Sequence, residues 1–103
     1  MKKLRLAGAA AAIALLSLPA GAQAPDSAQV RGWAAACAAC HGTEGRAAPG
    51  NVPLAGMARD EMVRKLMDFK NGRAQATVMH QLAKGYSDEQ IAAIAAWFAA
   101  QKR

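Results

Sequence analysis

Two cysteines and a histidine stand within five consecutive residues of this 103-residue chain, in the order Cys-Ala-Ala-Cys-His at residues 37–41. Thiols three positions apart come round to the same side of a helical turn, so each can form a thioether to one of the two vinyl groups of haem. The imidazole of His41 follows directly and can then ligate the iron. Because Cys37 and Cys40 are the only cysteines in the chain, the pattern accounts for both. It predicts one covalently bound haem c, held by Cys37, Cys40 and His41.

Other functions of a C-x-x-C pair require different surroundings. A thioredoxin-like dithiol needs a βαβ context, and no stretch of this sequence alternates convincingly in the manner of a strand. A structural zinc ion needs four ligands, and beyond the motif only His80 is a plausible fourth. A disulfide between Cys37 and Cys40 would close a very short loop and stabilise the fold little. These comparisons favour haem attachment.

The iron has a second axial position, and the chain offers several ligands for it. A thioether raises the reduction potential relative to a second imidazole. Met62 and Met67 fall on the apolar face of a predicted helix, where packing is the commoner role. Met57 at the end of a loop stays open, and His80 offers a bis-histidine alternative. Met79 lies in a turn-rich segment that can come round the other haem face, and we favour it as the second iron ligand.

The N-terminus has the order of a secretory signal peptide. Residues 1–5 are basic, residues 6–18 carry no charge, and residues 20–22 give the small-x-small pattern of a cleavage site. The apolar run is shorter than the roughly 18 residues of a membrane span. We therefore predict a signal peptide at residues 1–22 and one domain at residues 23–103, located in the periplasm. The alternative is an uncleaved anchor, which is the only case in which we expect membrane association.

Charge and composition restrict the partners and indicate a thin core. The net charge of +6 would fall to +3 after loss of Lys2, Lys3 and Arg5. This mild surplus suits docking to an acidic protein face, and no basic run interleaved with aromatics points to nucleic acid. Alanine dominates the apolar residues, with two Trp, two Phe and one Tyr. Alanine buries little area, so a domain this small gains from packing on a large cofactor.

The element pattern predicts an all-α domain of about four short helices around the cofactor. Apolar residues recur at helical spacing, and in the last helix they form a stripe of Ile91, Ile94, Ala95 and Phe98 that we expect to be buried. Asp26 and Ser87 can cap helices, Ser87 in a capping box with Gln90, and Gly72 can close a helix. The predicted helices are 27–39, 59–71, 77–84 and a last helix from 87 onward. The Gly- and Pro-rich segment 42–56 has no periodicity, and loops of this length usually wrap something functional.

Packing expectations follow from the same pattern. The first and last helices should cross through Gly32, Trp33, Trp97 and Phe98, where packing is the default role of the aromatics. An apolar ring needs an apolar slot, so we expect porphyrin contacts from Leu54, Leu66, Val78 and Leu82. Tyr86 either bonds a propionate or the backbone, or caps the start of the last helix.

Three stretches carry a resemblance to a known family. They are Asn-Val-Pro-Leu-Ala-Gly-Met at 51–57, Phe-Lys-Asn-Gly-Arg at 69–73 and Ala-Thr-Val-Met-His-Gln-Leu-Ala-Lys-Gly-Tyr-Ser-Asp at 76–88. From residue 37 onward the chain resembles small bacterial class I cytochromes c. More narrowly, it is similar to the haem subunit of flavocytochrome c sulfide dehydrogenase.

The resemblance implies specific roles for site residues. Met79 corresponds to the distal iron ligand, and the carbonyl of Pro53 to the acceptor of a bond from the unligated ring nitrogen of His41. Related sequences often place one residue between the loop proline and the Leu-Ala-Gly stretch, whereas here Pro53 and Leu54 adjoin.

The resemblance also implies a function: electron transfer by a His/Met-ligated haem c. The chain would be the cytochrome subunit or electron acceptor of an FAD-containing flavoprotein that oxidises sulfide. Six-coordinate iron leaves no open site for substrate, so the chain itself is not expected to be an enzyme. One alternative is a stand-alone soluble periplasmic cytochrome c carrier, and a second is a ligand-binding haem protein with an open sixth site. The third is a haem-free dithiol or metal module.

Overall fold

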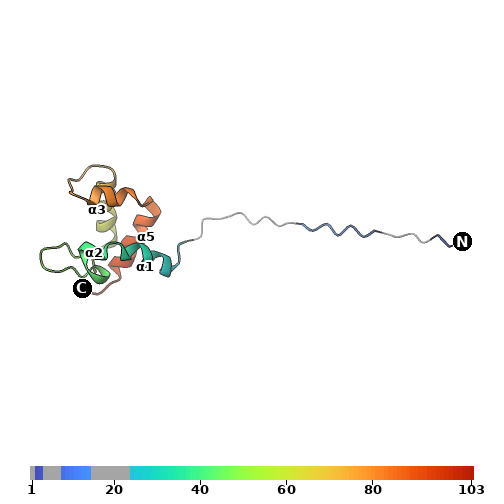
Figure 1. The fold of residues 1–103 in the computed structure, drawn as a ribbon, viewed down its shortest axis with the longest axis horizontal. Coiled ribbons are helices and arrows are strands. Elements are labelled where there is room, and N and C mark those ends of the chain that lie inside the picture. The colour runs from blue at the N-terminus through green and yellow to red at the C-terminus, as the bar shows by residue number, and fades with distance from the viewer. Residues whose placement is uncertain (1, 4–7, 15–23) are drawn as a thin grey trace.

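The fold is all-α over the residues that the computed structural model describes, which are 2–3, 8–14 and 24–103. Figure 1 shows the helices gathered into one body. Five α-helices and one short 3-10 turn appear in these residues, and no strand does. They are α1 (Ser27–Ala35), α2 (Ala38–His41), η1 (Thr43–Gly45), α3 (Arg59–Lys70), α4 (Met79–Lys84) and α5 (Asp88–Ala99).

The first predicted helix is divided into two. Asp26 caps α1 as expected, with its carboxylate accepting from the backbone N–H of Gln29 at 2.7 Å. The helix then ends at Ala35 instead of residue 39, because the N–H of Cys37 bonds the carbonyl of Ala34 at 3.0 Å, three residues back. This tighter turn interrupts the α-helical hydrogen bonds. The chain resumes as α2, which carries the second cysteine and the histidine of the motif.

Helices α3 and α5 follow the sequence pattern closely. Gly72 follows the end of α3 with φ of +75°, the left-handed conformation expected of a closing glycine. Ser87 caps α5 in a full capping box, since its hydroxyl accepts from the N–H of Gln90 while the Gln90 side chain accepts from the N–H of Ser87. Helix α4 begins at Met79, two residues later than predicted.

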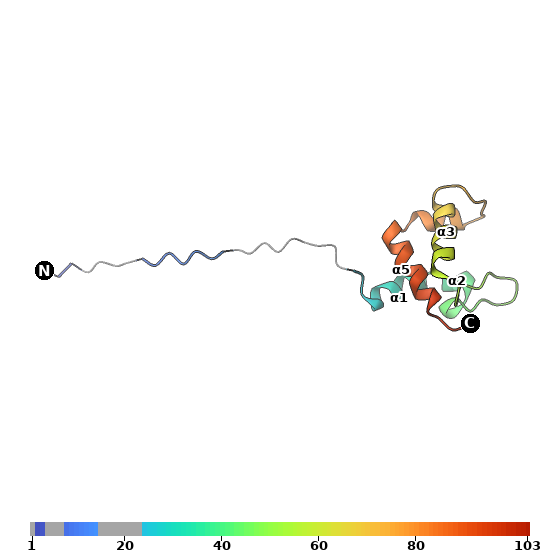
Figure 2. The same ribbon diagram turned by 180° about the vertical axis from the view of Figure 1, so that it is seen from behind.

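The core lies where α5 packs against α1 and α3, and the two views of Figures 1 and 2 both place α1 beside α5. The predicted stripe of α5 is buried, with exposed fractions of at most 3%: Ile91, Ile94, Ala95 and Phe98. Trp33 and Trp97 pack against this core. The expectation for Gly32 is wrong, because it is exposed and a Cβ there would meet nothing within 4 Å. Ala34, which is 2% exposed, takes that place in the core.

The long loop after α2 is closed by backbone bonds. The carbonyl of Gly45 accepts from the N–H groups of Leu54 at 2.9 Å and Ala55 at 3.1 Å. Gly56 donates to the carbonyl of Phe98 at 2.9 Å, which fastens the loop to α5. At Gly45 φ is +80°, and a Cβ would lie 2.7 Å from the backbone nitrogen of Ala55. Only glycine fits this approach without displacement of the backbone.

Most of the predicted signal peptide, residues 1–22, lies outside the described residues. The parts that are described, 2–3 and 8–14, have no regular secondary structure. Among the residues described, no helix has the length and apolar character to cross a membrane.

Candidate cofactor site

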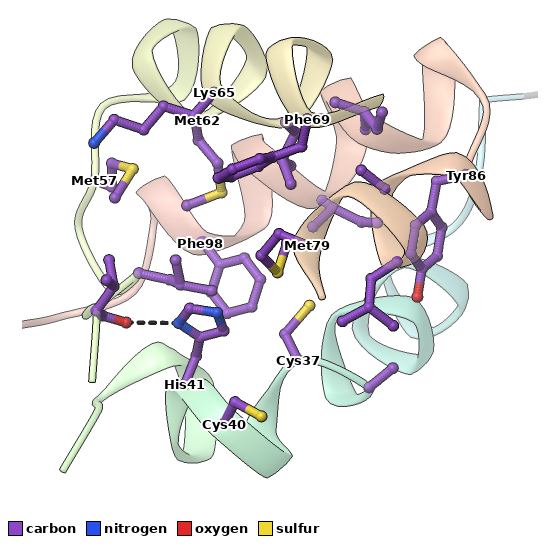
Figure 3. A pocket seen from close by; sticks show the side chains of 18 of the residues that line it. Cys37, Cys40, His41, Met57, Met62, Lys65, Phe69, Met79, Tyr86 and Phe98 are labelled. Carbon is purple, nitrogen blue, oxygen red and sulfur yellow. Dashed lines mark hydrogen bonds between the residues drawn. The ribbon is translucent and has the colours of Figure 1, made fainter. Parts of the chain in front are cut away.

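A cavity of about 310 Å³ is enclosed between α2, the long loop, α3, α4 and α5. Figure 3 shows its side chains pointing inward from these elements. The lining is predominantly apolar, and nearly all of the predicted site residues contribute to it. Those lining residues include Cys37, Cys40, His41, Val52, Leu54, Met57, Met62, Lys65, Leu66, Phe69, Val78, Met79, Leu82, Tyr86 and Phe98.

The proximal wall of the cavity, which we define as Cys37, Cys40, His41 and Val52, is built from one helical turn and one loop. The N–H of His41 bonds the carbonyl of Cys37 at 2.9 Å, so the motif is coiled and presents its side chains to one side. Nδ1 of His41 lies 2.6 Å from the carbonyl oxygen of Val52, and the Nδ1–H tautomer donates this bond. That tautomer leaves Nε2 with a free lone pair, as a metal ligand requires.

The bond to Val52 corrects the expectation for Pro53. The acceptor is one residue earlier than predicted, and Pro53 lines a different cavity, on the other side of the loop. The reason is the shortened spacing before Leu54. Counted back from Leu54, the carbonyl that meets His41 is two positions away, and that position is Val52. The one sequence feature that could have indicated Val52 is that Pro53 and Leu54 are adjacent.

The two thiols have different surroundings. Both are free, with Cys37 half-buried and Cys40 exposed. Burial raises the pKa of the Cys37 thiol above its usual value. A catalytic dithiol needs a lowered thiol pKa, so this shift argues against the dithiol alternative. No cluster of three or more His, Cys, Asp or Glu side chains suited to a metal ion occurs in the described part of the chain.

The distal wall of the cavity carries three of the candidate thioethers. Met57, Met62 and Met79 line the cavity, whereas Met67 and His80 do not. Met62 is 3% exposed and belongs to the core, and Met57 packs against that core. Met79 is the first residue of α4, and Figure 3 shows its side chain reaching into the space shared with His41 and Cys37. Nδ1 of His80 is buried with no hydrogen-bond partner in the described residues.

Two of the apolar side chains that line the cavity on the side of α4 are exposed. Val78 and Leu82, one turn apart at α4, are 46% and 51% exposed, and both line the cavity. Leu54 and Leu66 line it as well. Their contact with a porphyrin stays a prediction. Apolar side chains that face one cavity form a surface on which an apolar ring would bury area.

Tyr86 borders the cavity near Cys37. Burial raises the pKa of its hydroxyl, and the nearby Cys37 adds to the rise. The hydroxyl therefore stays protonated near neutral pH and is available as a hydrogen-bond donor.

The donor set fits haem c. Two thiols lie one helical turn apart, an imidazole is oriented through Nδ1, and a methionine lies in the same apolar cavity. Hard cations prefer carboxylate and amide oxygens, and no Asp, Glu, Asn or Gln is among the described residues that line this cavity, whereas a haem iron accepts nitrogen and thioether ligands.

The comparisons with known proteins agree with this chemistry. Residues 24–98 match the family model described as cytochrome c oxidase, cbb3-type, subunit III. This chain belongs to that cytochrome c family. Its members carry covalently bound haem c, and the predicted all-α class I cytochrome c fold is confirmed.

Three relatives show how much of the chain is shared. Cytochrome c4 of Pseudomonas aeruginosa is 39% identical over 80 residues, covering 77% of this chain and 40% of that protein. The cytochrome subunit of sulfide dehydrogenase of Chlorobaculum tepidum is 42% identical over 62 residues, covering 60% of this chain and 56% of that protein. Cytochrome c-553 of Helicobacter pylori is 38% identical over 85 residues, covering 81% and 88%. The chain thus spans about half the length of the first two.

Proposed function

We propose that this chain transfers single electrons through one haem c that Cys37 and Cys40 tether and that His41 and Met79 ligate. The observation that carries the proposal is the meeting of a half-buried thiol, an oriented imidazole and a methionine side chain in one apolar cavity. When bound, the haem supplies an iron that alternates between two oxidation states. The thioether ligand raises the reduction potential relative to a second imidazole.

The side chains of the site have distinct tasks in this proposal. The carbonyl of Val52 fixes the His41 ring and increases the basicity of its other nitrogen. Leu54, Leu66 and Leu82 line the cavity and would cover apolar surface of the bound ring, which would limit the access of water to the site. With both axial positions filled there is no site for a substrate on the iron, so we propose a carrier or subunit and not an enzyme.

Met79 is the ligand we assign among the thioethers that line the cavity. Met57 and Met62 are engaged in core packing. Met79 lines the cavity from the N-terminal end of a short helix outside that buried cluster. Moving Met57 or Met62 to an iron would open the core, whereas Met79 can ligate without that cost.

A sulfide-oxidising flavoprotein is the partner we propose. One relative is named the cytochrome subunit of sulfide dehydrogenase, and the matched region includes part of its length. The FAD-containing subunit would donate electrons to the haem, and the site of the reaction would be the periplasm after removal of residues 1–22. Co-purification of an FAD protein that reduces this chain when sulfide is added tests the partner.

A stand-alone carrier is the second candidate. The match to cytochrome c-553 covers 88% of that protein and 81% of this chain. Nearly the whole of that single small cytochrome is therefore matched by this chain. A chain that purifies alone and is reduced by unrelated donors supports this candidate over the subunit.

Carbon monoxide tests the six-coordinate site itself. CO binds ferrous haem only at an open or readily vacated position, so we expect the reduced wild-type protein to keep its visible spectrum when CO is added at neutral pH. Each sample is compared with its own CO-free spectrum. Immediate and complete formation of a CO complex would favour the ligand-binding alternative and contradict His/Met ligation.

A further inference from the structure

The segment that carries Met79 is joined to the rest of the fold by a lysine. Lys70 is the last residue of α3, and its ammonium donates to the backbone carbonyl of Tyr86 at 2.7 Å and to the carboxylate of Asp88 at 2.8 Å. The residues between, 71–86, contain α4 and Met79, and we call them the Met79 segment. Its two ends therefore meet at one side chain, since the segment starts directly after Lys70 and ends at Tyr86.

The lysine of this contact is better shielded from water than the basic residues of the other ion pairs in the described residues, whereas its partner Asp88 is 65% exposed. The Lys70 side chain is 23% exposed, whereas the basic partners in those other pairs are between 46% and 62% exposed. Bonds to a charged group are the stronger class of hydrogen bond, and shielding protects them from competition by water and salt. Of the two bonds, the one to the Tyr86 carbonyl is part-buried and the one to the Asp88 carboxylate is exposed, so the first is the better protected. Lys70 is therefore placed to restrain the segment in a way that an exposed pair such as Arg73 with Asp68 is not.

The contact bears directly on the cavity. Tyr86, whose carbonyl accepts the bond, lines the cavity together with Met79. Helix α4 packs on α3, so the segment folds back over the helix that ends in Lys70. Release of the lysine would remove one tertiary restraint at the C-terminal end of the segment, while the packing of α4 on α3 would remain.

We propose that Lys70 is a positioning residue for Met79, and that it keeps the thioether at the iron against displacement by external ligands. The inference rests on the proposed function, in which Met79 is an iron ligand. It adds that the strength of the Met79–iron bond depends partly on the Lys70 ammonium, which bonds the carbonyl of Tyr86 at the end of the Met79 segment. The proximal wall does not depend on it.

Imidazole binding to the oxidised holoprotein measures this restraint. Imidazole must displace Met79, so its apparent affinity rises with the fraction of molecules in which Met79 has left the iron. We expect Lys70→Met to bind imidazole roughly tenfold more tightly than wild type, because two charge-assisted bonds are lost. The Met-to-iron charge-transfer band should weaken, while the covalently held haem is retained.

The control variant is Lys84→Met. Lys84 is an exposed lysine on α4, in the same segment, so the change removes the same charge. It should leave imidazole affinity within about twofold of wild type. Lys70→Arg keeps the charge and should restore part of the lost resistance. Equal imidazole affinities in Lys70→Met and Lys84→Met would overturn the inference.

A second pair of variants decides the matter if Lys70→Met yields no holoprotein. Asp88→Asn and Glu89→Gln each remove one acidic group from the first turn of α5. Only Asp88 contacts Lys70. We expect roughly threefold tighter imidazole binding for Asp88→Asn alone, since one of the two bonds persists. Identical behaviour of the two variants would overturn the inference.

Failure of the proposed function would look different. In that case the wild-type protein would lack the Met-to-iron band and would bind imidazole without loss of any such band. Failure of the inference alone leaves a wild-type band intact and only removes the difference between the Lys70 and Lys84 variants.

Discussion

The two walls of the cavity are built in opposite ways. The proximal wall takes three of its four side chains from five consecutive residues, and a single bond from His41 to the carbonyl of Val52 orients it. The proposed distal ligand lies on the Met79 segment, which is held at the cavity by tertiary contacts, among them the packing of α4 on α3 and the bonds of Lys70. Local geometry secures one ligand, and tertiary contacts secure the other. We therefore expect external ligands to displace Met79 more easily than His41.

Removing the distal ligand is the change with the largest expected effect. Met79→Ala should abolish the Met-to-iron charge-transfer band completely, lower the reduction potential and allow CO to bind the reduced protein. The haem should stay attached, because nothing on the proximal wall is altered. Visible spectra and a redox titration measure these effects.

Met67→Ala is the matched control for that change. Met67 lies on α3 but does not line the cavity. It should keep the band and the potential, with a stability loss of up to about 3 kcal/mol from reduced packing. A Met79→Ala protein with an unchanged spectrum would remove Met79 from the site and leave Met57 or Met62 to be tested.

Alanine substitutions at Gly45, in the long loop, and at Gly72, at the start of the Met79 segment, test how tightly the two regions are packed. Gly45 and Gly72 both have positive φ, at +80° and +75°. A Cβ at Gly45 would meet Ala55, Leu54 and Phe98 within 2.9 Å, whereas at Gly72 it meets nothing within 4 Å. Gly45→Ala should lose about 2–4 kcal/mol of unfolding free energy, and Gly72→Ala about 1 kcal/mol from backbone strain alone. Denaturant unfolding of both holoproteins gives the values, and equal losses would show that the long loop is less tightly packed than its contacts indicate.

The sequence was most informative where structure is local. The capping box at Ser87 and Gln90, the closing Gly72 and the buried stripe of α5 were all predicted and are confirmed. These features depend on residues within a few positions of one another, where propensity and periodicity are strong signals.

Other features depend on register or on distant contacts, and these were missed. The break after Ala35 arises from a tightened turn in an alanine-rich stretch, whose apolar pattern is the same in one helix or two. The acceptor for His41 is Val52 and not Pro53, and which loop carbonyl faces His41 depends on the register of the folded loop. The Lys70 contacts join residues 16 and 18 positions apart, and nothing in their local sequence marks the pairing.

The central claim is that two thiols tether one haem, and the intact mass of the exported protein tests it most directly. Each thiol adds its S–H across a vinyl group, so no atom leaves and the masses simply sum. After expression with haem-maturation machinery we predict the mass of the processed chain plus one haem, unchanged by denaturation. A colourless protein with the mass of the bare chain would contradict the account.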